Sequence, residues 1–284
     1  MSRLADYFAV IGIPKASSTD GTKELNGKVL QRFPSQDRKD VNFPEGLEMF
    51  CQPGGWEVSY YNKPSTFYVS VLTDMVGNRS YVACLSFLEP FTLVKKRDEF
   101  QSAGDVGTIN ISSDSKEGSN ELKQDVQMEA YYPKCLCLVS RFTYFDILKS
   151  CLAAIYTSWL NEDGARLEKI IGSILGFVQV PTVGSDAITF SVGMGEKKTL
   201  SPPLWDQVPV TGKSVANVFR MLGMHNVLSL FCALVTENKV LLFSSSYSLL
   251  TSASLGLLSI LYPLKFSYVY IPILPSALLD FISA

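Results

Sequence analysis

Two short motifs place residues that could bind phosphate or act as nucleophiles at the start of predicted helices. Gly212-Lys213-Ser214 resembles the end of a phosphate-binding loop, but Gln207 stands where that loop needs a glycine for its backbone to wrap a phosphate. The run 244–246 contains three serines between a predicted strand and helix, without the glycines of a nucleophile elbow. We therefore interpret both motifs as helix starts, where Ser and Thr are favoured as caps.

Histidine and cysteine usage argues against metal or triad chemistry. His225 is the only histidine, which removes most histidine-containing zinc sites. Cys135 and Cys137 are separated by one residue, whereas paired zinc ligands are separated by two. Most of the six cysteines lie in apolar runs, as buried, reduced cysteines do. The carboxylates form no obvious acid–base pair. The sequence thus predicts no catalytic residue, no metal site and no cofactor.

Arg141 is the strongest candidate for binding a partner. It follows a predicted strand and precedes the aromatic residues Phe142 and Tyr144. A guanidinium there could bind a carboxylate or phosphate with two parallel hydrogen bonds. The alternative is an arginine that extends its head group to solvent at the strand end or caps a helix. Ser245 and Tyr247, at the start of a later helix, complete the predicted partner-binding set.

The first half of the chain has the pattern of an antiparallel sheet followed by two helices. Turn residues at Asp74–Asn78 separate two alternating runs and predict a hairpin. Apolar residues at helical spacing predict helices at 142–160 and 163–177, the second started by Asn161 or Asp163. The predicted strands are Leu4–Ile13, Leu47–Cys51, Thr66–Thr73, Arg79–Phe87 and Lys134–Ser140.

Residues 93–127 change character, being rich in Ser, Gly, Asp and Glu. Such a segment buries too little surface to offset its ordering entropy, so we expect a disordered insert within a first domain of residues 1–178. Residues 179–209, with several glycines and prolines, are expected to connect this domain to a second one, residues 210–284.

The second domain has the pattern of a parallel sheet. Predicted helices at 214–222 and 226–236 meet at Gly223. A predicted strand at 239–244, which would bury Leu241, is followed by a helix at 247–261 and a strand at 266–271, an order typical of a βαβ unit. The predicted fold class is therefore α/β: an antiparallel sheet with helices, then a partial parallel-sheet core.

Composition bounds the kind of partner. The 284 residues are 47% hydrophobic with a net charge of −2, which gives no basic field for nucleic acid. The start of the chain lacks the apolar core of a signal peptide. Charges and prolines interrupt every apolar run before the roughly 20 residues of a membrane span. We expect a cytoplasmic protein without a transmembrane segment.

Several long motifs in order resemble a DENN domain. The central region is LFCALVTENKVLLFSSSYSLLTSASLGLLSILYPLKFSYVYIPILPSALLDFISA, and the upstream region is FYVSVLTDMVGNRSYVACLSF and YYPKCLCLVSRFTYFDILKSCLAAIYTSWL. MSRLADYF, LQRFPSQD and FPEGLEMFCQPGGW resemble the SET-binding-factor branch of myotubularin-related pseudophosphatases. The resemblance implies a longin-like first domain and a guanine-nucleotide exchange module for Rab-type GTPases. It also implies a binding surface spanning both domains and, in the full-length protein, peripheral association with endomembranes.

Other functions remain open on the sequence. One is a scaffold that binds a GTPase or trafficking partner without exchange. Another is a hydrolase or NTPase, which the incomplete motifs disfavour, and a third is GTPase activation with Arg141 as an arginine finger. The resemblance predicts a further strand beyond Ala284, so we expect a fragment that binds a GTPase weakly, and a longer form that promotes exchange.

Overall fold

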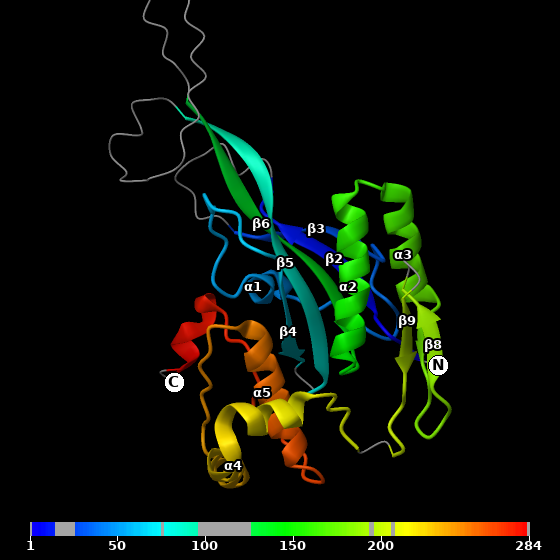
Figure 1. The fold of residues 1–284 in the computed structure, drawn as a ribbon, viewed down its shortest axis with the longest axis vertical. Coiled ribbons are helices and arrows are strands. Elements are labelled where there is room, and N and C mark those ends of the chain that lie inside the picture. Colours follow the sequence, from blue (N-terminus) through cyan, green and yellow to red (C-terminus); the bar gives the residue numbers. More distant parts are fainter. Residues whose placement is uncertain are drawn as a thin grey trace, which may run out of the picture.

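The computed structural model describes residues 2–14, 26–74, 77–95, 126–192, 196–205 and 208–282. Figure 1 shows a central sheet with α2 (Phe145–Leu160) and α3 (Gly164–Gly176) beside it, and α4 (Ser214–Val235) and α5 (Tyr247–Ile260) grouped at one end. Helices and strands are both well represented, so the predicted α/β class is confirmed.

The central sheet is antiparallel throughout, in the order β3–β2–β6–β5–β4. Its strands are β3 (Lys28–Phe33), β2 (Tyr7–Gly12), β6 (Val126–Ser140), β5 (Arg79–Lys95) and β4 (Thr66–Thr73). The predicted hairpin forms: β4 and β5 pair from Thr66↔Ser86 to Thr73↔Arg79. Asp74 accepts the backbone N–H of Gly77 and donates its own to Asn78, which closes the turn.

Strands β5 and β6 extend into the segment expected to be disordered. Their pairing continues through Leu93↔Met128 to Lys95↔Val126. The predicted boundaries of the insert were therefore wrong at both ends, because strand-favouring residues such as Val94 and Val126 continue the antiparallel pairing. Residues 96–125 lie outside the described part of the chain.

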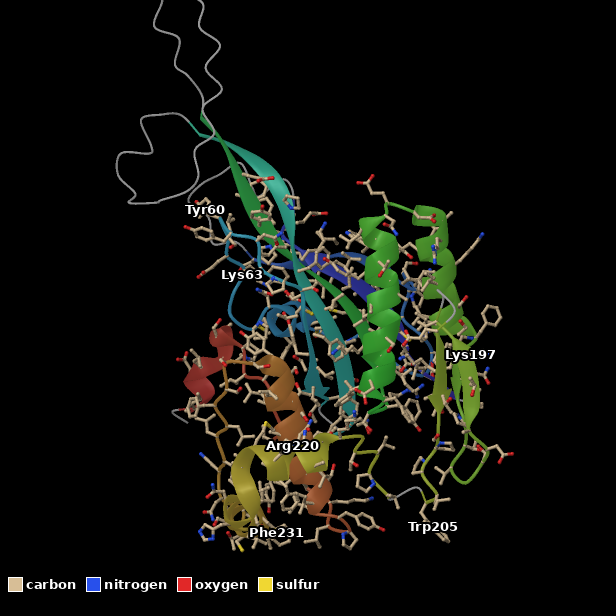
Figure 2. All side chains as sticks on the ribbon, in the orientation of Figure 1. Tyr60, Lys63, Lys197, Trp205, Arg220 and Phe231 are labelled. Atoms are coloured by element: carbon tan, nitrogen blue, oxygen red, sulfur yellow. The ribbon has the colours of Figure 1, made fainter. Side chains whose placement is uncertain are left out.

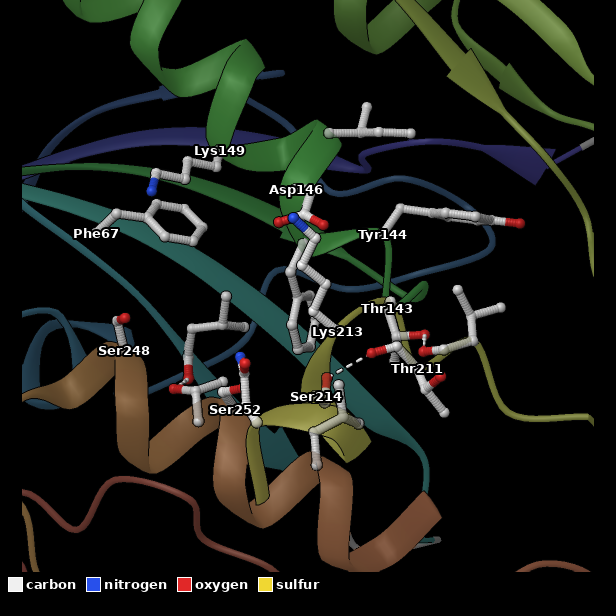
Figure 3. A pocket seen from close by; sticks show the side chains of 18 of the residues that line it. Phe67, Thr143, Tyr144, Asp146, Lys149, Thr211, Lys213, Ser214, Ser248 and Ser252 are labelled. Atoms are coloured by element: carbon white, nitrogen blue, oxygen red, sulfur yellow. Dashed lines mark hydrogen bonds between the residues drawn. The ribbon is translucent and has the colours of Figure 1, made fainter. Parts of the chain in front are cut away.

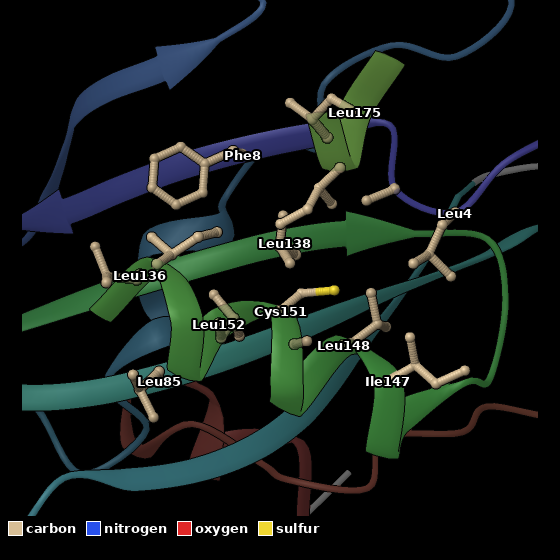
Figure 4. Packing of buried hydrophobic residues seen from close by; sticks show 14 of the residues in the cluster. Leu4, Phe8, Leu85, Leu136, Leu138, Ile147, Leu148, Cys151, Leu152 and Leu175 are labelled. Carbon is tan, nitrogen blue, oxygen red and sulfur yellow. The ribbon is translucent and has the colours of Figure 1, made fainter. Parts of the chain in front are cut away.

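Both faces of the sheet are covered. On one face, Phe8, Leu136 and Leu138 pack against Leu148 and Leu152 of α2 (Figure 4). The opposite face packs against α1 (Leu47–Cys51) and the C-terminal segment, with these residues buried among others: Tyr7, Tyr68, Val82, Cys84, Cys135, Cys137 and Ile273. Alternate residues of each strand thus serve two separate cores.

Two local predictions were wrong in the first half, and the connector contains strands that were not predicted. Leu47–Cys51 is a helix and not a strand: Leu47 and Cys51 are the buried pair at i and i+4, and Gly46, with φ 70°, starts the turn. The strand at the N-terminus is shorter than Leu4–Ile13. The connector contains a hairpin of β8 (Ile188–Ser191) and β9 (Lys197–Leu200), and the short strands β1 (Ser2–Arg3) and β7 (Gln179–Val180) pair with each other.

The two long helices beside the sheet follow the prediction. The helix α2 begins three residues later than expected. Asp163 caps α3, since its carboxylate accepts the backbone N–H of Arg166 at 3.1 Å.

The second half is helical where helices were predicted but lacks the predicted parallel strands. α4 is broken at Gly223 (φ 75°, ψ 162°), as expected, and α5 matches the predicted helix closely. Segments 239–244 and 266–271 flank α5 without forming strands. The two segments alone would form a sheet of only two strands, which is marginally stable. Among the described residues, neither segment pairs with any strand. A short 3₁₀ helix, Ser276–Ile282, follows.

The second half exposes much apolar surface. Met224 is 64% exposed, Phe243 86% and Val269 83%. Among the described helices, only α4 has the length and composition to cross a membrane. The break at Gly223 divides it into two segments, neither as long as the roughly 20 residues required.

Candidate functional site

A cleft lies where the sheet and the helices of the second half meet. It encloses about 440 Å³ and is bounded by Phe67–Val69 of β4, the start of α2, residues 210–214, and α5. Figure 3 shows Lys149, Asp146 and Lys213 around this hollow, with Ser248 and Ser252 on the opposite wall. The cleft is therefore built by segments more than a hundred residues apart in the sequence.

Hydrogen bonds fix the two walls of the cleft to each other. The buried hydroxyl of Thr251 in α5 donates to the backbone oxygen of Val69 in β4, at 2.8 Å. On the other side, the Thr143 hydroxyl donates to the backbone oxygen of Val210 at 3.3 Å. Because these bonds join the sheet layer to the second half directly, the cleft is preformed and does not require a partner to assemble it.

The rim of the cleft carries charge. Lys149, Asp146 and Lys213 are exposed, and the Lys149 ammonium lies 5.6 Å from the centre of the Phe67 ring. Lys213 precedes α4 directly and extends towards Asp146 (Figure 3). These charges are accessible to a partner and would affect its association rate and orientation.

A second cavity, of about 760 Å³, opens beside the first, and Thr143, Val210 and Leu255 line both. Arg79 lies within it: its guanidinium donates to the backbone oxygen of Phe266 at 2.9 Å and sits 5.0 Å from the centre of the Tyr270 ring.

Tyr270 is also fixed in this wall. Its hydroxyl lies 3.1 Å from that of Ser254, and burial raises the pKa of Tyr270 to about 12. The segment after α5 is thereby held against the sheet even though it forms no strand.

Arg141 lines the second cavity but is committed to an internal ion pair. Its guanidinium contacts the carboxylate of Asp6 at 2.9 and 3.1 Å, and Asp6 is buried. Arg3 contacts the same carboxylate at 3.2 Å and also pairs with the exposed Asp40 at 2.6 Å. The hydrogen bond from Arg3 lowers the pKa of Asp40. Arg141 thus forms two hydrogen bonds with a carboxylate of its own chain, Asp6. Its side chain is turned towards Asp6 and does not extend outwards as an arginine finger does.

Among the other predicted partner residues, Phe142 and Tyr144 lie close together, with ring centres 6.3 Å apart. Phe142 is half-buried against α2, while Tyr144 is buried, lines the first cavity and donates its hydroxyl to the backbone oxygen of Ser201 at 3.3 Å. Ser245 is exposed before α5. Tyr247 packs edge-on against Tyr68, with ring centres 5.2 Å apart.

Sequence reasoning missed most of the rim of the cleft. Lys213 was considered only as part of a phosphate-loop motif. Asp146, Lys149 and Arg79 were not predicted to bind a partner. The usable signal was the position of Gly212-Lys213-Ser214 at a helix start. Ser214 does begin α4, but its hydroxyl donates to the backbone oxygen of Thr211 at 2.5 Å instead of capping the helix.

Comparison with known proteins identifies the fold family. The model of the DENN (AEX-3) domain matches residues 131–284, and that of the uDENN domain matches residues 27–87. The chain belongs to the DENN domain family. It is similar to "DENN domain and WD repeat-containing protein SCD1" of Arabidopsis thaliana (28% identity, covering 100% of this chain and 23% of that protein). It is also similar to "DENN domain-containing protein 3" of Mus musculus (25% identity, 87% and 19%).

The two family matches meet at the cleft. Phe67–Val69 lie in the uDENN match, whereas α2, α4 and α5 lie in the DENN match. The chain spans about a fifth of the length of these relatives. DENN domain proteins are generally exchange factors for Rab GTPases in membrane trafficking.

Proposed function

We propose that this chain is a guanine-nucleotide exchange module for a Rab-type small GTPase. One observation carries the proposal: in a DENN-family chain, the uDENN and DENN segments together build a preformed cleft with an accessible, charged rim. The DENN resemblance implies a contact surface that spans both domains, and the cleft lies where the segments matched by the two family models meet.

Exchange of this kind needs no covalent chemistry. The factor binds the nucleotide-free GTPase more tightly than the loaded form, and by linkage it therefore weakens nucleotide binding by the same factor. The chain's own contribution is rigidity. The Thr251–Val69 and Thr143–Val210 hydrogen bonds keep the two walls at a fixed separation, so binding energy is not lost in ordering them.

The proposed contact surface is the rim of the first cavity together with neighbouring exposed residues. Lys149 and Lys213 present two positive charges, and Ser245 lies exposed just before α5. Tyr144 lines this cavity and donates its hydroxyl to Ser201, whereas Arg141 lines the second cavity and is held by Asp6. An acidic patch on the GTPase would complement the lysines and accelerate association.

The proposal extends to domain organisation and cellular context. We propose a longin-like upstream domain at residues 1–178, a connector at 179–209 and a central DENN domain at 210–284. We place the protein in the cytoplasm, peripheral on endomembranes. The SET-binding-factor branch stays part of the proposal on the first sixty residues, although the relatives above are named for other DENN proteins.

We also propose that a longer form is the more active exchange factor. Met224, Phe243 and Val269 expose large apolar side chains in the second half. Exposed apolar residues of this kind are typical of a surface that other protein segments cover. None of these three residues lines either cavity, so further contacts there would add to the affinity that the preformed cleft provides.

The test is release of a fluorescent guanine nucleotide from a panel of Rab GTPases. Charge reversal in Lys213→Glu should slow release by about 2- to 30-fold, because it removes an exposed ion pair of about 0.2–1 kcal/mol and adds a repulsion of similar size. Lys197→Glu is the matched control, since Lys197 is exposed on β9, away from α4 and α5 (Figure 2).

The outcomes separate exchange from the alternatives. Faster release that Lys213→Glu slows and Lys197→Glu leaves unchanged supports exchange at this cleft. Binding without any release would favour a scaffold, and faster hydrolysis lost in Arg141→Ala would favour GTPase activation.

A further inference from the structure

Four cysteine thiols meet beneath the sheet, opposite α2 and α3. Cys135 and Cys137 are two residues apart in β6 and so face the same side of the sheet. Cys84, in the neighbouring strand β5, pairs directly with Cys137. Cys51 comes from α1, which packs on that face. All four side chains are fully buried.

The four sulfur atoms lie within 4.8 Å of one another. The separations involving Cys137 are 3.2 Å to Cys51, 3.4 Å to Cys135 and 3.8 Å to Cys84, and Cys51 and Cys84 are 3.9 Å apart. Tetrahedral zinc with Zn–S bonds of about 2.3 Å requires its sulfurs to be about 3.8 Å apart. The arrangement therefore approximates the ligand cage of a single ion.

We propose that these cysteines form a structural Zn²⁺ site. Four thiolates are a donor set that zinc prefers, and a complete set of four leaves no open position for catalysis. Binding replaces four S–H bonds with four Zn–S bonds, and four protons pass to solvent with no change of oxidation state. A cluster of several irons would hold its thiolates farther apart than these separations.

The site would join parts of the fold that are distant in sequence. Cys51 and Cys84 lie in the segment matched by the uDENN model, and Cys135 and Cys137 lie in the DENN match. Tyr247 and Leu250 of α5, and Ile273 beyond it, pack against the same cluster of buried residues. An ion here would fix α1 to the sheet and support the surface on which α5 rests.

The experiment uses the 284-residue chain. Because the thiols are buried, the ion must enter during folding, so the chain is refolded under reducing conditions with Zn²⁺ or with a chelator. Bound zinc is then measured by elemental mass spectrometry after gel filtration. A parallel refolding with Co²⁺ reports ligand type, since tetrahedral thiolate coordination gives sulfur-to-cobalt charge-transfer and intense visible bands.

Two variants assign the metal to the cluster. Cys137→Ser removes the thiol closest to the other three. Cys151→Ser is the matched control, because Cys151 is equally buried but lies in α2, in the core on the other face of the sheet (Figure 4).

The proposal predicts about one zinc ion per wild-type and Cys151→Ser chain, and less than about a tenth of that in Cys137→Ser. If Cys137→Ser does not fold, the cobalt spectrum of the wild-type chain decides alone. Wild-type chain refolded with excess Zn²⁺ or Co²⁺ that holds no ion and shows no thiolate bands overturns the proposal. So does a Cys51–Cys137 disulfide in folded, metal-free chain under these conditions.

Discussion

Removing the Asp6 carboxylate should destabilise the fold far more than removing the neighbouring Asp40 carboxylate. Both acids contact Arg3 and Arg141. The side chain of Asp6 is only 1% exposed, whereas that of Asp40 is 48% exposed. Comparing the two substitutions therefore tests the effect of burial, because both remove a carboxylate that contacts the same two arginines.

The magnitude follows from that burial. Removing one partner of a buried ion pair costs about 3–5 kcal/mol, chiefly through the charge left behind. Here the arginines that remain are 26% and 36% exposed and can turn to water, so we expect about 2–4 kcal/mol for Asp6→Ala. Asp40→Ala should cost no more than about 1 kcal/mol, because a solvated pair contributes little.

Thermal unfolding of both variants, followed by tryptophan fluorescence, measures the difference. At about 2–4 °C per kcal/mol, Asp6→Ala should lower the Tm by about 4–16 °C, and Asp40→Ala by less than about 4 °C. Adding Arg141→Ala to Asp6→Ala should cost little more than the single change, because the two residues interact with each other. Equal losses for the two acids, or additive losses for Asp6 and Arg141, would refute the assignment of Arg141 to an internal role.

Two further predictions concern packing. Gly256→Ala should destabilise the chain by about 1–3 kcal/mol in a urea titration, because an added Cβ would lie 2.5 Å from Val218 Cγ2 at the α4–α5 contact. Gly172→Ala is the control, since no atom lies within 4 Å of the added Cβ, and it should be neutral or stabilising. Leu241→Asp should still fold, because Leu241 is 50% exposed, whereas Leu257→Asp should not, because Leu257 is 4% exposed. Gel filtration measures the outcome, and similar profiles for the two variants would contradict the prediction.

Local patterns in the sequence predicted the regular elements well. Gly77 and Asn78 marked the β4–β5 hairpin, and Gly223 marked the break in α4, because both depend on neighbours in the chain. Leu47–Cys51 was misassigned because five residues are too few to distinguish alternation from a helical turn. Segments 239–244 and 266–271 have strand-like composition, but strand formation depends on a partner strand, which composition does not reveal.

The sites were less predictable because they join distant segments. For Arg141 the sequence offered a carboxylate or phosphate of a partner, or a solvent-exposed or capping role, and it did not indicate Asp6, which is 135 residues away. Cys135 and Cys137 did not match the spacing of a zinc motif, since the two other thiols come from Cys51 and Cys84 through the packing of α1 and the β5–β6 register. Lys149 and Lys213 meet at one rim only through the docking of α2 and α4.

Nucleotide release from Rab GTPases tests the central claim most directly. The wild-type chain, Lys213→Glu and Lys197→Glu are compared at increasing concentrations, together with a longer form of the protein. We predict that at least one Rab releases its nucleotide faster, that the longer form is more effective, and that Lys213→Glu weakens the effect whereas Lys197→Glu does not. No acceleration across the panel by either form, or full activity in Lys213→Glu, would contradict this prediction.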